Sequence, residues 1–154
     1  MSAKSNTLHD VFGFDSFRPG QEDIVDDLLA GRHVLAVMPT GSGKSLCYQV
    51  PALVRGGLTV VVSPLVALMQ DQVAALKLAG VAAETINSAA SREINVAIWQ
   101  RVAAGDVRIL YMAPERLMTE RMIAALQRLD VRPIAVDEAH RLNEKSGLYR
   151  NLGD

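Results

Sequence analysis

The chain has 154 residues, of which 49% are apolar and 21% charged, and its formal net charge is −1. This composition predicts one globular domain with an ordinary core and excludes a mainly disordered chain, which would combine low hydrophobicity with high net charge. The near-neutral charge argues against binding of nucleic acid by bulk electrostatic attraction.

The sequence gives no sign of a membrane or secreted protein. No apolar run approaches the roughly 20 residues that span a bilayer, and the first ten residues, MSAKSNTLHD, lack the apolar segment of a secretory signal. The single cysteine, Cys47, excludes an internal disulfide and any metal site made of several cysteines. We therefore expect an intracellular, cytoplasmic protein.

Short β-branched apolar runs alternate along the chain with longer segments of helical periodicity. The runs predict strands at residues 33–38, 58–63, 81–87, 107–112 and 133–137. The other segments predict helices at residues 21–29, 44–54, 65–78, 91–104 and 115–129. Near-continuous apolar strands that alternate with helices are typical of a parallel sheet covered on both faces. The sequence therefore predicts a layered α/β fold, in which ligands bind beyond the carboxyl ends of the strands.

A glycine-rich loop follows the first predicted strand and precedes a helix. It contains Thr40, Gly41, Ser42, Gly43, Lys44 and Ser45. Such glycines let backbone N–H groups surround a phosphate, the lysine reaches the β- and γ-phosphates, and the serine hydroxyl suits Mg²⁺. The strict phosphate-loop pattern requires glycine where this chain has Met38. The alternative interpretation of the loop is an ordinary turn that contains a lysine. The order of strand, loop and helix favours nucleotide binding.

An acidic pair, Asp137 and Glu138, follows the last predicted strand within the tetrapeptide DEAH. Phosphoryl transfer to water needs one carboxylate to hold Mg²⁺ and a second group to orient or deprotonate the water. Asp137 fits the first role and Glu138 the second, although a helix-capping cluster is the alternative. For His140, a relay between two sites and a local hydrogen bond both remain open.

Together the two motifs resemble motifs I and II of superfamily-two helicases. The longer string MPTGSGKSLCYQVPAL at residues 38–53 is similar to RecQ-like DNA helicases. Residues 12–21 resemble the family's adenine-recognition motif, residues 62–72 its motif Ia and residues 111–117 its motif Ib. The resemblance covers about residues 9–140 and implies a three-layer, P-loop, RecA-like fold with a mostly parallel sheet. It divides the chain into an N-terminal segment (1–32), an ATP-binding lobe (33–140) and a divergent tail (141–154).

The resemblance also implies a site for ATP and Mg²⁺. Gln21 would present its amide to the adenine edge, with Phe14 and Arg18 on the two faces of the base. For Phe14 the alternative is a hydrophobic staple ahead of the helix at 21–29. Lys44 and Glu138 would be the catalytic residues. The nucleotide contacts would be Phe14, Arg18, Gln21, Thr40, Gly41, Ser42, Gly43, Lys44 and Ser45, and the metal contacts Ser45 and Asp137.

A second implied partner is DNA, single-stranded or partly duplex, whose phosphates Ser63, Gln70 and Arg116 would contact. For an arginine such as Arg116 a solvated surface position is the alternative. Trp99 lies on an apolar helical stripe and is expected in the core rather than stacked on a base. Cys47 is expected to be a small buried hydrophobe rather than a nucleophile.

The sequence departs from the family after His140. Residues 141–154 lack the Gln-Trp-Gly-His core of the aromatic-rich loop, and motif III and the second RecA-like lobe do not follow. In the family the motif III strand lies between the phosphate-loop strand and the acidic-pair strand. We therefore expect a lobe truncated after the DEAH strand, of marginal stability or prone to aggregate, that hydrolyses ATP very slowly and does not unwind DNA alone.

Two functions remain open. The first is the ATP-binding motor lobe of a RecQ-like helicase of DNA repair or recombination, associated with the nucleoid if the source is bacterial. The second is a truncated module that binds nucleotide or single-stranded DNA without productive catalysis. A P-loop kinase or GTPase is disfavoured, because Gln21 points to adenine and the chain lacks the Asn-Lys-x-Asp element that reads guanine.

Overall fold

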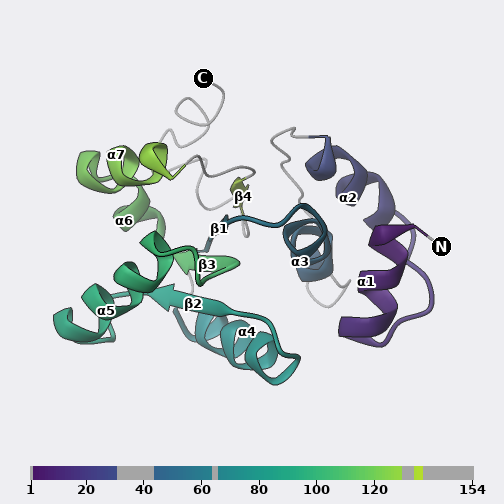
Figure 1. Cartoon of the computed structure of the whole chain (residues 1–154), viewed down its shortest axis with the longest axis horizontal. Helices are drawn as coiled ribbons and strands as arrows, with labels where there is room; N and C mark the ends of the chain where they lie inside the picture. Colours follow the sequence, from purple (N-terminus) through teal and green to yellow (C-terminus); the bar gives the residue numbers. More distant parts are fainter. Residues whose placement is uncertain (1, 31–43, 64–65, 130–133, 137–154) are drawn as a thin grey trace.

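The computed structural model of the chain describes residues 2–30, 44–63, 66–129 and 134–136 (Figure 1). The helices are α1 (Ala3–Phe12), α2 (Gln21–Leu29), α3 (Lys44–Arg55), α4 (Val66–Leu78), α5 (Arg92–Ala103), α6 (Pro114–Leu117) and α7 (Glu120–Arg128). The strands are β1 (Thr59–Val62), β2 (Ala83–Ile86), β3 (Ile109–Met112) and β4 (Ile134–Val136). Among the helices described, none has both the length and the apolar character needed to cross a membrane.

The described strands form one parallel sheet in the order β2-β3-β1-β4. Val61 in β1 lies opposite Tyr111 in β3 and, on its other side, opposite Ala135 in β4. Four of the predicted strands are thereby confirmed, while the strand predicted at 33–38 lies outside the described residues. Because all four strands are parallel, their carboxyl ends meet at one edge of the sheet.

One face of the sheet packs against α5, α6 and α7. Alternate strand residues point to opposite faces, and Val60, Val62, Leu110 and Met112 point to this one. They form a cluster with residues from the three helices, namely Val102, Leu117 and Leu126. Trp99 packs against the same cluster, so its predicted place in the core is confirmed.

The opposite face packs against α3 and α4. Val61, Ile109 and Tyr111 point to it and meet Tyr48 and Ala52 from α3 and Met69, Val73 and Leu76 from α4. Helices therefore cover both faces of the sheet, which confirms the predicted three-layer α/β fold (Figure 1).

Two further helices lie outside α3, on the side away from the sheet (Figure 1). Leu8 of α1, Val25 of α2 and Val50 of α3 form a third apolar cluster. All residues from Cys47 to Ala52 are buried as a result. α3 is thus enclosed by the sheet on one side and by α1 and α2 on the other.

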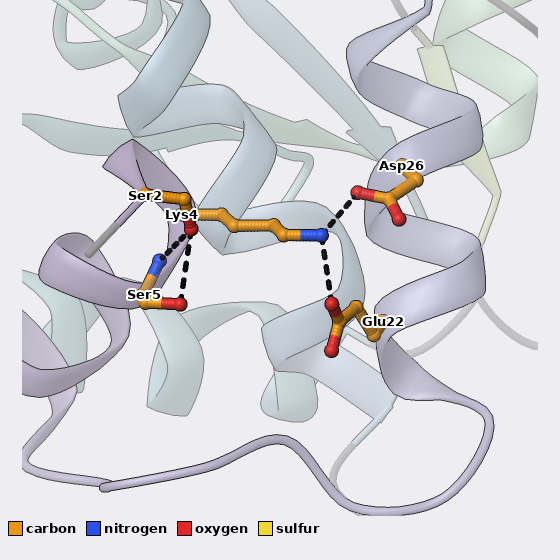
Figure 2. Close-up of polar contacts among 5 residues, drawn as sticks. All are labelled: Ser2, Lys4, Ser5, Glu22 and Asp26. Atoms are coloured by element: carbon orange, nitrogen blue, oxygen red, sulfur yellow. Dashed lines mark hydrogen bonds and ion pairs between the residues drawn. The ribbon is translucent and has the colours of Figure 1, made fainter.

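α1 is not among the predicted helices, because its helical period is weakly marked by apolar residues. Its signals are at the ends: the Ser2 hydroxyl accepts a hydrogen bond from the Ser5 N–H, and Gly13 follows the helix with φ 77°. Lys4 Nζ joins α1 to α2, at 2.9 Å from Glu22 Oε1 and 2.6 Å from Asp26 Oδ1 (Figure 2). The hydrogen bonds that the Lys4 ammonium donates to the Asp26 and Glu22 carboxylates raise its pKa.

The prediction of one continuous helix at 115–129 is wrong, because the chain forms α6 and α7 there. Thr119 separates them in an extended conformation, with φ −72° and ψ 138°. Its hydroxyl donates to the Arg116 carbonyl at 2.9 Å and accepts from the Met122 N–H at 3.2 Å. A threonine that caps a new helix in this way competes with continuation of the old one.

The edge strand β2 carries a buried acid. Glu84 Oε1 lies 2.7 Å from Arg101 Nη1 of α5 and 3.1 Å from Lys77 Nζ of α4. The two cations come from helices on opposite faces of the sheet and meet at one carboxylate. Charged side chains on an edge strand discourage its pairing with another chain.

Candidate functional site

The predicted phosphate loop is described only from its last residues. α3 begins at Lys44, and Ser45 follows within its first turn. The first N–H groups of a helix have no acceptor within the helix, and its N-terminus carries a partial positive charge, so this end suits a phosphate. Thr40, Gly41, Ser42, Gly43, Asp137, Glu138 and His140 lie outside the described residues.

The N-terminal half of α3 lies beside the carboxyl edge of the sheet. Gln49 Nε2 donates a hydrogen bond to Tyr111 Oη, and Tyr111 is the penultimate residue of β3. Ser63 follows β1 at this edge, where its backbone N–H donates to the Met112 carbonyl at 3.1 Å. The helix that begins at Lys44 and the ends of two central strands therefore converge where an α/β fold places its ligand.

The segment before α2 holds Gln21 in a fixed turn. Gln21 is 2% exposed, and its Oε1 accepts the Arg18 backbone N–H at 2.7 Å. Its own N–H donates to the Arg18 carbonyl at 3.0 Å, and Gly20 between them has φ 86°, a conformation that favours glycine. The acceptor oxygen of the Gln21 amide therefore helps to hold the turn that presents Arg18.

The two side chains predicted on the faces of adenine both reach solvent. Phe14 is 47% exposed and Arg18 is exposed. Phe17, by contrast, packs against the cluster of Leu8, Val25 and Val50. The exposure of Phe14 disfavours its alternative role as a hydrophobic staple.

The three predicted DNA contacts differ in accessibility. Gln70 lies exposed on α4, and Arg116 lies half-buried in α6. Ser63 is 1% exposed at the end of β1. The surface that a nucleic acid could reach is therefore offered by Gln70 and Arg116.

A polar network that the sequence pattern did not predict joins α3 to α4 and β3. Tyr48 Oη donates to Gln72 Oε1 at 2.6 Å, and Gln49 Nε2 donates to Tyr111 Oη at 3.1 Å. The rings of Tyr48 and Tyr111 meet edge to face, with centroids 6.3 Å apart and an interplanar angle of 70°. The available signal was Tyr48 and Gln49 within the buried segment of α3 and Tyr111 within the otherwise apolar strand β3.

Cys47 is 2% exposed on α3, which confirms its predicted burial. Burial raises the pKa of its thiol to about 11. Because the thiolate is the nucleophilic form, this cysteine is unreactive near neutral pH.

Comparison with known proteins places these features in a family. A profile of the DEAD/DEAH box helicases matches residues 18–152. Among curated relatives, an ATP-dependent DNA helicase RecQ from Pasteurella multocida is 42% identical over 139 residues, which is 90% of this chain and 22% of that protein. The RecQ helicase of Bacillus subtilis is 44% identical over 146 residues, 92% of this chain and 24% of its own length. This chain therefore spans about a quarter or less of either relative.

Solved structures share the fold. The DUF1998 helicase MrfA, bound to DNA and AMPPNP, superposes with a TM-score of 0.71 at 22% identity, covering 92% of this chain and 21% of that one. A hypothetical ATP-dependent RNA helicase from Sulfolobus tokodaii gives a TM-score of 0.72 at 21% identity, covering 94% of this chain and 43% of its own. These likenesses confirm the helicase RecA-like fold, and the sequence relatives confirm the resemblance to RecQ-like helicases. With the profile match over most of its length, the chain belongs to the DEAD/DEAH box helicase family.

Proposed function

We propose that this chain is the ATP-binding first lobe of a RecQ-like DNA helicase, in which ATP hydrolysis drives strand unwinding. The supporting observation is that α3 begins at Lys44, directly after the glycine-rich loop, and is packed against the carboxyl edge of a parallel sheet. Because the chain spans 22% of its Pasteurella relative, unwinding is proposed for this lobe acting together with a second RecA-like lobe.

The proposed nucleotide site uses residues on both sides of α3's N-terminus. Lys44 and the N–H groups of Thr40, Gly41, Ser42 and Gly43 hold the phosphates, because together they supply positive charge and aligned donors. Ser45 and Asp137 hold Mg²⁺ with oxygen ligands, which this cation prefers. The bound nucleotide supplies the phosphoanhydride bond, and Glu138 orients or deprotonates the attacking water.

The base and the DNA are held by other segments. Gln21 reads the adenine edge, while Phe14 and Arg18 lie against its two faces. Gln70 and Arg116 contact the phosphates of a single strand, and Ser63, which is 1% exposed at the end of β1, joins them only if the strand end is uncovered. With a net charge of −1, we expect weak DNA binding by this lobe alone, falling steeply as salt is added.

The test is nucleotide binding by the Lys44→Ala variant, followed with a fluorescent ATP analogue and Mg²⁺. The affinity should fall at least about tenfold, since hydrogen bonds to charged groups contribute about 1.5–3 kcal/mol. Lys77→Ala is the matched control, because this lysine lies on α4 and pairs with Glu84; it should bind as the unaltered chain does. Equal binding by Lys44→Ala and the control would contradict the assigned loop.

Glu138→Gln separates binding from hydrolysis. This variant should retain the nucleotide affinity of the unaltered chain and lose its residual ATP hydrolysis, measured as released phosphate. Undiminished hydrolysis would remove Glu138 from its proposed role. If the unaltered chain binds nucleotide and releases no phosphate at all, a binding module without catalysis is the better description.

A further inference from the structure

We propose that two side-chain hydrogen bonds, Tyr48 to Gln72 and Gln49 to Tyr111, couple nucleotide binding at α3 to the DNA contacts on α4 and α6. The inference rests on the proposed function, since it takes Lys44 as a nucleotide contact and Gln70 and Arg116 as DNA contacts. The four residues of the network touch neither ligand in this proposal. They are positioning residues that fix where the ligand-binding segments lie relative to one another.

The network begins on α3. Tyr48 and Gln49 lie four and five residues after Lys44, about one turn along the same helix. Both are buried, with 7% and 6% exposure. A rigid helix transmits any shift of its N-terminus to side chains one turn further on. A shift of the N-terminus of α3 on phosphate binding would therefore move Tyr48 and Gln49 together.

The two hydrogen bonds connect α3 to α4 and to β3. Gln72 lies on α4, two residues after Gln70, and accepts the Tyr48 hydroxyl at 2.6 Å. Tyr111 accepts from Gln49 at 3.1 Å and is followed closely by α6, which carries Arg116. α3, which begins at Lys44, is thus hydrogen-bonded to both segments that present accessible DNA contacts.

Tyr111 is also linked to Ser63 through the backbone of β3 and β1. Tyr111 lies opposite Val61 in the register of β3 and β1, and the next residue, Met112, accepts the Ser63 N–H at 3.1 Å. A displacement of the end of β3 therefore reaches the third predicted DNA contact through the backbone. All three contacts are linked to α3 by way of the two hydrogen bonds.

The two hydrogen bonds form one network, because the rings of Tyr48 and Tyr111 are in contact. The edge-to-face contact of Tyr48 with Tyr111 joins the two hydrogen bonds at a ring distance of 6.3 Å. Polar groups within an apolar cluster are costly when they lose their partners, so the pairs favour one relative placement of α3, α4 and β3. A purely structural role for the network would affect folding and leave the link between the two ligands unchanged.

The experiment measures a coupling factor in the 154-residue chain. This factor is the Kd for a fluorescent oligothymidine without nucleotide divided by the Kd with a non-hydrolysable ATP analogue and Mg²⁺. Coupling between two sites is typically about 5- to 150-fold. Tyr48→Phe and Tyr111→Phe keep both rings and remove one hydroxyl each, and we expect either change to bring the factor toward one while nucleotide alone still binds.

A double variant and a matched control sharpen the result. Tyr48→Phe combined with Gln72→Leu should lower the factor no further than either change alone, because both remove the same hydrogen bond. Leu110→Ala alters the residue next to Tyr111 that faces the opposite side of the sheet, and it should destabilise the chain while leaving the factor unchanged. Folding of every variant is checked by circular dichroism.

Hydrogen exchange in the unaltered chain provides a measurement that needs no variant. Nucleotide binding should slow amide exchange at residues 69–76 and 109–117, which contain Gln72 and Tyr111. Unchanged exchange there on nucleotide binding, or unchanged coupling in folded Phe variants, would overturn the inference and leave the proposed function intact. Failure of the unaltered chain to bind nucleotide would overturn both, and it would be seen before any variant is made.

Discussion

The two faces of the sheet differ in chemistry, and two neighbouring residues of β3 show the difference. Leu110 faces α5, α6 and α7, where the buried cluster consists entirely of apolar residues. Tyr111 faces α3 and α4, where hydroxyl and amide groups pair within the buried layer. Around Leu110 the first face offers burial, which is non-directional, and its buried ion pair, Glu84 with Arg101 of α5, lies at the edge strand β2. The second adds hydrogen bonds, which fix direction and register.

The position of the polar face explains why it differs. It lies between the sheet and α3, the helix that begins at Lys44, and it extends to α4 through Gln72. An apolar contact tolerates small sliding movements with little change in buried area, whereas a hydrogen bond weakens steeply when its geometry is lost. On the α3 side, directional contacts thus reach the central strand β3, where the relative placement of helices would affect ligand contacts. On the other face, the Glu84–Arg101 ion pair ties α5 to the edge strand β2.

The largest expected effect in this comparison is that of Leu110→Ala. Leu110 is fully buried, and truncation of such a leucine costs about 2–5 kcal/mol through lost burial and the cavity left behind. The free energy of unfolding, measured by urea titration, should fall by this amount. A loss below about 1 kcal/mol would show that the face can collapse around the cavity and is packed less tightly than its burial suggests.

A smaller effect is expected for Tyr111→Phe on the other face. The ring contact with Tyr48 remains, while the buried Gln49 amide loses the hydroxyl to which it donates. A buried polar group left without its partner costs about 1–3 kcal/mol, which the same urea titration can detect. A free energy of unfolding equal to that of the unaltered chain would mean that Gln49 finds another acceptor.

The smallest effect concerns the pH dependence that Cys47 gives to α3. Burial raises the pKa of this thiol from 9.0 to about 11. Well below pH 9 the thiol is protonated in both states and adds no pH dependence. Between about pH 9 and 11 the unfolded chain loses the proton before the folded chain does, so the free energy of unfolding should fall as pH rises, most steeply about midway between these values.

Cys47→Ala isolates this contribution. Other groups that titrate at high pH are present in both proteins, so the difference between the two stability curves belongs to the thiol. That difference should change between about pH 9 and 11 and be constant well below pH 9. Parallel curves over the whole range would contradict burial as the cause of the raised pKa.

The sequence predicted secondary structure well wherever its signals were local. The helix predicted at 21–29 is α2, and the helix predicted at 44–54 extends one residue further as α3, with Pro51 inside it. α1 was missed because its signals lie in its caps rather than in its apolar period. The helix at 115–129 was wrongly joined because apolar periodicity continues across Thr119, whose hydroxyl instead caps a new helix.

By itself the sequence determined the order of strands and helices, the three-layer class and the motifs that carry the predicted site, because periodicity and glycine spacing are local properties of the chain. Only the tertiary structure decided which buried polar groups meet. Tyr48 and Gln72 are 24 residues apart in sequence, and Gln49 and Tyr111 are 62 apart. Their pairing depends on α3, α4 and β3 packing on the same face of the sheet, and this placement follows from burial of the whole apolar surface rather than from any local pattern.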